Sequence, residues 1–272
     1  MGKTREDEIR TERSQFVVES NALIQRTRYE LTLEEQRLLK YVISKIKPDD
    51  EKLKYCEFTI RDYCDVCGIN LDAVPDMYNY IKRTITTLKS RTFWIKRERD
   101  GIEEEVTFQW IDKAIMRKRS GVVSIKLDDD LAPYLLEQRR QYTQYQLLSV
   151  LPMKSKYSSR LYEVLRAELP RGRRYREVTY TLEDLQDRLG ITGANGKSYR
   201  KNPTMFRKFI MDGALEEIAL YTDITASAEY LKAGKKIDRV RIEIRQLKDE
   251  QAMSNALRAE RELYKRTDRA TQ

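Results

Sequence analysis

The sequence contains no histidine and only three cysteines. Histidine is the commonest general base near neutral pH and the commonest metal ligand, so Cys2His2 zinc fingers and histidine-dependent DNA nicking are excluded. Cys64 and Cys67 form an isolated C-x-x-C pair, and Cys56 is the one remaining thiol. Because a structural zinc ion needs four ligands, we expect no metal site, and the absent histidines also disfavour an enzyme that acts on DNA.

Long apolar segments are also missing. No apolar run reaches the roughly 18 residues that a membrane-spanning helix needs. The N-terminal residues MGKTREDEIR are charged, unlike a signal peptide. A small, odd number of cysteines fits a reducing compartment. These features predict a cytoplasmic protein without membrane association.

Charge is abundant, with 53 Lys and Arg against 44 Asp and Glu and a formal net charge of +9. A basic excess favours a polyanionic partner, either a nucleic acid or an anionic membrane surface. Net charge alone is equally compatible with a basic protein that binds neither. The position of the charges along the chain must therefore decide.

The chain repeats itself. Phe58–Ile69 matches Tyr180–Ile191 residue by residue, with an identical Thr, two Asp, Gly and Ile in each copy. Two further blocks match in the same order: Arg37–Val42 with Arg160–Leu165, and Pro75–Tyr78 with Pro203–Phe206. Three ordered matches at nearly constant spacing indicate duplication of a whole domain of more than 100 residues.

Each copy predicts the same order of elements. Thr32 and Glu35 form a capping box before a helical apolar pattern, and Gly68 ends a second helix that Thr59 caps. The first copy then predicts a short strand over Glu57–Thr59, a helix over Pro75–Lys89, and strands over Thr92–Ile95, Val106–Ile111 and Val122–Leu127. The second predicts helices over Ser155–Leu169, Thr181–Leu189 and Pro203–Tyr221, and strands over Glu177–Tyr180, Ile224–Leu231 and Ile237–Arg245.

A helix–turn–helix followed by a β-hairpin is the winged-helix pattern. We therefore expect an α+β protein with two tandem winged-helix domains related by duplication. The predicted domains cover residues 16–139 and 140–246, after a flexible N-terminus over residues 1–15. Leu257, Leu263 and Tyr264 are too sparse for a strong helix face, so the charged tail over residues 247–272 should fray or be partly helical.

Both predicted hairpins have basic tips. The tip cations are Arg117, Lys118 and Arg119 in the first copy and Lys232, Lys235 and Lys236 in the second. A charged turn often serves solubility alone. Equivalent tips in both copies favour contact with DNA phosphates.

The helix from Pro203 is the strongest candidate for reading base pairs, with Asn202 at its N-cap. At α-helical spacing, Phe206, Phe209, Ile210 and Gly213 share the face that should be buried, opposite Thr204, Arg207, Lys208 and Met211. The loop before it adds Lys197, Arg200 and Lys201. We expect Arg200, Asn202, Arg207 and Lys208 to reach bases, although simple capping is the stronger interpretation of Asn202.

The equivalent helix of the first copy presents Asn79 and Arg83 as candidate DNA contacts. Its start is less basic, because Asp72 and Asp76 would repel phosphate. We expect weaker reading of DNA by this copy, or another role.

The chain resembles the iteron-binding plasmid replication initiators, the RepE/RepA-like group, over about residues 16–246. The resemblance lies in these motifs: Val17–Ile24, Leu31–Leu39, Lys154–Glu163, Phe206–Ile218, Thr222–Asp223, Lys235–Lys236 and Arg241–Ile244. It implies binding as a monomer to directly repeated double-stranded sites at an origin, with the second domain reading DNA. It also implies recruitment of the host initiator and replicative helicase, no cofactor and no enzymatic activity of the chain itself.

The same resemblance implies homodimers, formed through the first domain, in equilibrium with monomers and acting as an autorepressor. It maps Lys154, Lys156 and Arg160 to the start of the second domain's first helix, where we expect phosphate contacts. A winged-helix transcriptional repressor without a replication role is the alternative.

Overall fold

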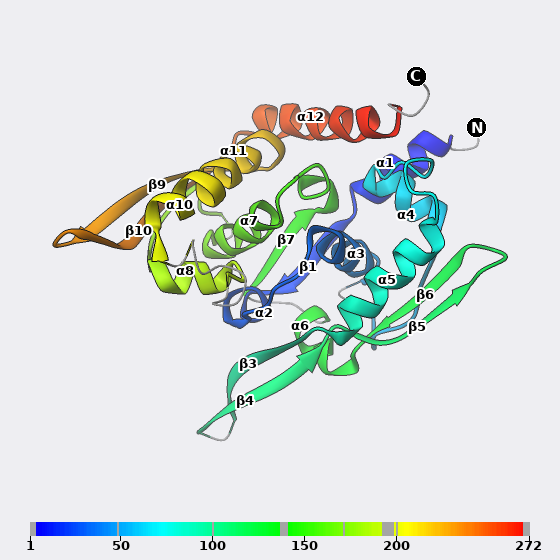
Figure 1. Ribbon diagram of the computed structural model, residues 1–272, viewed down its shortest axis with the longest axis horizontal. Coiled ribbons are helices and arrows are strands. Elements are labelled where there is room, and N and C mark those ends of the chain that lie inside the picture. Colours follow the sequence, from blue (N-terminus) through cyan, green and yellow to red (C-terminus); the bar gives the residue numbers. More distant parts are fainter. Residues whose placement is uncertain are drawn as a thin grey trace.

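The computed structural model describes residues 4–47, 49–99, 101–136, 141–170, 172–191, 199 and 201–268 (Figure 1). The first half contains α1 (Arg5–Arg13), β1 (Phe16–Ser20), α2 (Asn21–Arg26), α3 (Leu33–Ser44), β2 (Cys56–Thr59), α4 (Ile60–Cys67), α5 (Met77–Ser90), β3 (Thr92–Arg99), β4 (Ile102–Gln109), β5 (Ile111–Arg117), β6 (Val122–Leu127) and α6 (Ala132–Leu135). The second contains β7 (Tyr142–Gln146), α7 (Lys156–Glu168), β8 (Tyr175–Thr181), α8 (Leu182–Arg188), α10 (Pro203–Phe206), the π-helical segment η3 (Arg207–Met211), α11 (Asp212–Tyr221), β9 (Ile224–Ala233), β10 (Lys236–Gln246) and α12 (Asp249–Asp268).

The duplication is confirmed in the order of elements and in the sheets. The first copy runs α3, β2, α4, α5, β5 and β6, and β6 lies between β2 and β5. The second runs α7, β8, α8, α10–η3–α11, β9 and β10, and β10 lies between β8 and β9. Both halves therefore have the α+β winged-helix fold, with β5–β6 and β9–β10 as the wings.

The predicted helix ends are confirmed where a local signal sets them. The Thr32 hydroxyl accepts from the Glu35 N–H, and the Glu35 carboxylate accepts from the Thr32 N–H, as a capping box requires. Thr59 and Asp62 repeat this arrangement at α4. Gly68 ends α4 with φ of 64°, a left-handed conformation that favours glycine.

The first copy carries a hairpin beyond its wing. We predicted one strand over Val106–Ile111, but the chain leaves the ladder at Trp110, which is buried against Phe93 at a ring-centroid distance of 4.2 Å. The β3–β4 hairpin therefore stands apart from β5–β6, as Figure 1 shows.

Residues 5–13 form the helix α1, although we expected residues 1–15 to be flexible. Thr4 and Asp7 form a capping box at the start of α1. Arg13 at its end is buried and donates to the carbonyls of Asp65 and Val66 in α4. The charged sequence REDEIRTER does not indicate this packing, because the contacts that hold the helix are polar and leave no apolar pattern.

The tail is helical over residues 249–268, which form α12, and it packs more firmly than its sparse apolar residues led us to expect. Ala259 and Leu263 are fully buried, although such a short apolar stripe looked too weak to pack. Near its start, Asn255 donates to the carbonyls of Ala219 and Thr222 in the second copy. Leu263, two turns later, packs on Gly68 of the first copy, so α12 links both halves.

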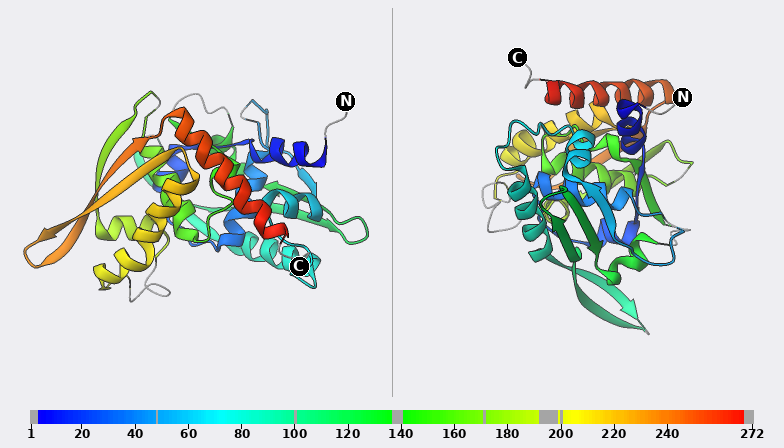
Figure 2. Two further views of the ribbon diagram at one scale, coloured as in Figure 1. Left: turned by 90° about the horizontal axis from the view of Figure 1, so that it is seen from above. Right: turned by 90° about the vertical axis from the view of Figure 1, so that its right-hand side faces the viewer.

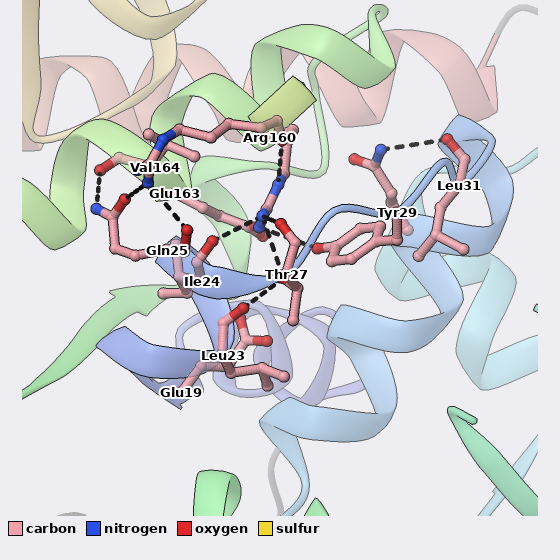
Figure 3. A network of polar contacts seen from close by, with 12 residues as sticks. Glu19, Leu23, Ile24, Gln25, Thr27, Tyr29, Leu31, Arg160, Glu163 and Val164 are labelled. Atoms are coloured by element: carbon pink, nitrogen blue, oxygen red, sulfur yellow. Dashed lines mark hydrogen bonds and ion pairs between the residues drawn. The ribbon is translucent and has the colours of Figure 1, made fainter. Parts of the chain in front are cut away.

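The two halves also share a sheet and a buried polar network. β1 pairs antiparallel with β7, so the predicted boundary at residues 139 and 140 does not separate the halves in space. The Lys40 Nζ atom lies 2.7 Å from Glu19 Oε2 and 2.9 Å from Glu163 Oε1, and all three side chains are buried. Burial alone would raise the pKa of Glu163, but Lys40 and Arg160 outweigh it and lower that pKa. Figure 3 shows how Arg160 extends this network toward the segment after α2.

Candidate nucleic-acid interface

The two candidate reading helices lie along the same side of the molecule. Figure 1 shows α5 and α10–α11 in front of the core, and the right-hand view of Figure 2 places both along one edge. The wings β5–β6 and β9–β10 project toward opposite ends of the long axis. A duplex laid along this side would meet both helix–turn–helix units and both wings.

The second reading helix begins at an asparagine cap. The Asn202 Oδ1 atom accepts hydrogen bonds from the N–H groups of Thr204 at 3.1 Å and Met205 at 3.2 Å. A bidentate contact with adenine would need that same oxygen. The geometry therefore favours the capping role of Asn202 over base reading.

A π-helical segment alters the faces of this helix. Hydrogen bonds in a π-helix span one residue more than in an α-helix, so side chains after Phe206 rotate away from their α-helical positions. As a result Met211 is buried and Phe209 is 58% exposed, the reverse of our prediction. Phe206 and Ile210 are buried as expected, whereas Gly213 is exposed.

Arg207 lies between the helix and the second wing. Its guanidinium carbon is 5.4 Å from the ring centroid of Tyr230 on β9, and its Nε atom is 3.6 Å from Asp212 Oδ1. The side chain nevertheless remains 60% exposed. Stacking on an aromatic ring restricts a long side chain, so Arg207 is held in an orientation rather than free to sweep solvent.

The remaining cations of the second copy surround this helix. Lys201 is exposed just before the N-cap, and Thr204 and Lys208 are exposed along the first turns. Lys232, Lys235 and Lys236 are exposed at the β9–β10 turn. Lys197 and Arg200, which we predicted as contacts, lie outside the described residues.

The first reading helix is capped by an acid. Asp76 accepts from the Asn79 N–H at 3.1 Å and from the Asn79 side-chain amide at 2.6 Å. These bonds, with lesser contributions from Lys118 and Arg83, lower the pKa of Asp76. Asn79 is thus committed to the cap, while Arg83 is exposed.

The first wing offers fewer unpaired cations than the second. The Arg117 guanidinium lies 3.0 Å from Glu57 Oε2, which also accepts from Ser124. Lys118 and Arg119 are exposed at the turn. The tip is basic as predicted, but one of its three cations has an acidic partner within the sheet.

One predicted phosphate contact is ruled out. Arg160 is 2% exposed, and its guanidinium donates to the carbonyls of Ile24, Thr27 and Arg188 (Figure 3). It also reaches Glu163 at 3.3 Å. A side chain enclosed by these acceptors cannot meet DNA, so Arg160 is structural. The motif Lys154–Glu163 drew attention to Arg160, but a sequence motif does not show which groups a side chain contacts.

The two neighbouring lysines remain accessible to different degrees. Lys154 is 69% exposed, and its Nζ atom lies 3.4 Å from Glu262 of α12. Lys156 is 27% exposed and lies 3.1 Å from Glu30. Contact with phosphate would have to replace these carboxylates, which is easier for Lys154.

Two aromatic residues at this interface escaped the sequence analysis. Tyr230 was read only as part of a strand, and Phe209 was assigned to the buried face. The signal for Tyr230 was its place on a wing strand, but its contact with Arg207 depends on tertiary packing. No sequence pattern indicated that Phe209 is exposed, because a short π-helical segment has no characteristic spacing of apolar residues.

Neither a metal site nor a membrane span appears in the described part of the chain. Across those residues, no group of three or more His, Cys, Asp or Glu could hold a metal ion. No helix among them has the length and apolar content that crossing a bilayer requires.

Comparison with solved structures supports this architecture. The chain matches a crystal structure of the Pi initiator protein in complex with iteron DNA with a TM-score of 0.68 and 17% identity, over 87% of this chain and 99% of that one. Weaker matches are domains 2 and 3 of RctB, with a TM-score of 0.47 and 12% identity over 81% of this chain and 85% of that one. The WH1 domain of MSBI1.176, a replication protein isolated from a multiple sclerosis patient, matches with a TM-score of 0.29 and 19% identity, over 38% of this chain and 77% of that one.

Two family models cover most of the chain. Residues 16–166 match the model for WH1 of the initiator replication proteins, and residues 181–244 match the model for WH2 of the initiator Rep proteins. The first match alone covers more than half of the chain. The tandem winged helices found here are those two units, and the chain belongs to the family of replication initiator (Rep) proteins.

Proposed function

We propose that this chain initiates plasmid replication by binding directly repeated double-stranded DNA sites at an origin. The observation that carries the proposal is the placement of two reading helices along one side of the molecule, with basic wings at either end. Likeness of fold to the iteron-bound Pi initiator across 87% of the chain supports it. Phosphate contacts from the wings would position the duplex, and side chains of α10–η3–α11 would read bases.

In this proposal the monomer binds each repeat and recruits the host initiator and replicative helicase, while a homodimer represses the protein's own gene. The chain has no catalytic step in this role, because unwinding and synthesis belong to the recruited proteins. A role at a plasmid origin places it in the cytoplasm.

A transcriptional repressor without a replication role is the second candidate, because winged helices serve both. The flanking DNA distinguishes them. Direct repeats of about two helical turns, the spacing that tandem reading helices would occupy, favour the initiator. A single inverted repeat over the promoter favours the repressor.

The test combines footprinting with replication. The purified chain should protect each direct repeat beside its gene, and a plasmid that carries those repeats should replicate only when the chain is supplied in trans. The matched control is the quadruple variant Thr204→Ala, Arg207→Ala, Lys208→Ala and Lys232→Ala, which should abolish both signals. Protection of an inverted repeat alone, with no replication, would support the repressor and overturn the proposal.

A further inference from the structure

Phe209 is the one large side chain in the predicted core-facing pattern of its helix that is exposed. It is 58% exposed, whereas its neighbours Phe206 and Ile210 are 0% and 2% exposed. It therefore contributes little to the core. Its place near the start of a candidate reading helix makes this exposed ring available for contact with DNA.

The π-helical segment decides where this ring lies. It shifts Met211 into the core and leaves Lys208 and Phe209 next to each other on the outer face, with the Lys208 Nζ atom 5.4 Å from the ring centroid. Exposed Thr204 lies one turn nearer the helix start. Arg207, by contrast, lies toward the wing against Tyr230. Phe209 therefore lies with Lys208 on the outer face of the helix, and not on the side that faces the wing.

The major groove offers one apolar feature to such a ring. Every base edge there presents hydrogen-bonding atoms, and thymine alone adds a methyl group at C5. Phenylalanine can neither donate nor accept a conventional hydrogen bond, so it cannot distinguish guanine from adenine by the usual pairing. An exposed Phe beside a Lys therefore matches a place on DNA where a thymine methyl group lies next to a phosphate or to a base edge that accepts hydrogen bonds.

We propose that Phe209 is a specificity-determining residue that contacts a thymine methyl group in the recognised site, while Lys208 contacts an acceptor beside it. This proposal rests on the proposed function, in which α10–η3–α11 enters the major groove. It adds an apolar contact to a surface that otherwise reads DNA through charge and hydrogen bonds.

The experiment replaces each thymine of one bound repeat, in turn, with deoxyuridine, which removes the methyl group and leaves the hydrogen-bonding edge intact. Binding is titrated with the wild-type chain and with Phe209→Ala. At one or two positions, deoxyuridine should weaken wild-type binding about fourfold, the value of burying one methyl group. The same replacement should have no effect on Phe209→Ala, because the partner of the methyl group is gone.

Two control variants make the result specific. Phe16→Ala removes an aromatic side chain that is 46% exposed on β1, and it should keep the full sensitivity to deoxyuridine. Lys208→Ala should weaken binding but also keep that sensitivity. If Phe209→Ala fails to fold, as judged by circular dichroism, Phe209→Ser at the same exposed position replaces it.

The outcomes separate the two proposals. If wild type binds the repeat tightly but tolerates deoxyuridine everywhere, the role of Phe209 is overturned and the proposed function stands. Equal sensitivity in wild type and Phe209→Ala also overturns it, because another residue then contacts the methyl group. If wild type binds no repeat at all, the proposed function itself fails.

Discussion

The two winged-helix copies keep the same frame but differ in what they present to a duplex. At equivalent positions, Gly68 and Gly190 both end the second helix in a left-handed conformation against another segment. Asp62 and Asp184 both pair with an arginine from the N-terminal region, Arg5 and Arg28 respectively. Duplication has thus preserved the residues that hold each helix–turn–helix unit to its neighbours.

The differences lie at the reading helices. The first is capped by the anionic side chain of Asp76, and the second by the neutral side chain of Asn202. A carboxylate at a helix start stabilises the helix dipole but occupies the place where a phosphate would otherwise bind. The second helix also contains the π segment that exposes Phe209. We infer that the second copy reads the base sequence of DNA, whereas the first mainly contacts the DNA backbone.

The largest expected effect concerns equivalent arginines in the two copies. Arg160 bridges carbonyls inside the core, whereas Arg37 at the matching position is half-buried and donates to the carbonyl of Met153. Arg160→Ala should lower the free energy of unfolding by about 3–5 kcal/mol, because it leaves several buried carbonyls without donors and leaves Glu163 with Lys40 but without its guanidinium partner. Arg37→Ala should cost about 1 kcal/mol.

Urea unfolding followed by circular dichroism measures both values. Lys156→Ala provides a control at the same helix with a half-exposed partner, and it should cost less than either arginine. Equal losses for Arg160→Ala and Arg37→Ala would mean that the buried network does not hold the halves together.

The next effect tests base reading directly. Arg207→Ala should weaken specific binding by about 1–3 kcal/mol and relax the preference at one base pair, because a guanidinium held against Tyr230 is oriented for a bidentate contact. Arg83→Ala in the first copy should weaken binding to all sequences alike. Fluorescence anisotropy with single-base variants of the repeat measures both. A uniform loss for Arg207→Ala would assign it to phosphate instead.

The salt dependence compares the wings. If the complex neutralises about six phosphates, the slope of log K against log salt should be about −5. Replacing Lys232, Lys235 and Lys236 by alanine should reduce that slope by about three. Replacing Arg117, Lys118 and Arg119 should reduce it less, because Arg117 already pairs with Glu57. A slope near zero for the wild-type chain would contradict an electrostatic interface.

The smallest effect concerns the acidic cap. Asp76→Asn keeps a good capping side chain, so unfolding should change by less than about 0.5 kcal/mol. Removing the charge should tighten DNA binding about two- to threefold at low salt, the size of one exposed charge contact. Thermal melts and binding titrations test the two parts. Unchanged affinity would mean that the start of α5 lies away from phosphate.

Much of the frame could be predicted, because short-range signals set it. Capping boxes at Thr32 and Thr59, the glycine stop at Gly68 and the proline at Pro203 each act within one helical turn, and the duplication supplied a second sample of the same pattern. These signals located the helices of both helix–turn–helix units and the second wing to within a few positions, whereas strand β5 of the first wing was not predicted.

The errors arose where tertiary contacts decide. Arg160 looks like a surface cation until the carbonyls around it are placed, and α12 looks too polar to pack until Gly68 offers a flat site for Leu263. The predicted buried and exposed faces of the helix after Pro203 were wrong, because a π-helical segment interrupts the α-helical period from which they were assigned. Each failure involves a residue whose partner lies far away in the sequence or whose backbone departs from the regular helix.

The central claim is that the second copy reads sequence and the first does not. It is tested by the ratio of affinities for a repeat and for unrelated DNA, measured at one salt concentration in two variants. Replacing Thr204, Arg207 and Lys208 by alanine should collapse that ratio toward one. Replacing Asn79, Arg83 and Lys82, which is also exposed on α5, should weaken both affinities and preserve the ratio. Loss of the ratio in the second variant, with retention in the first, would contradict the account.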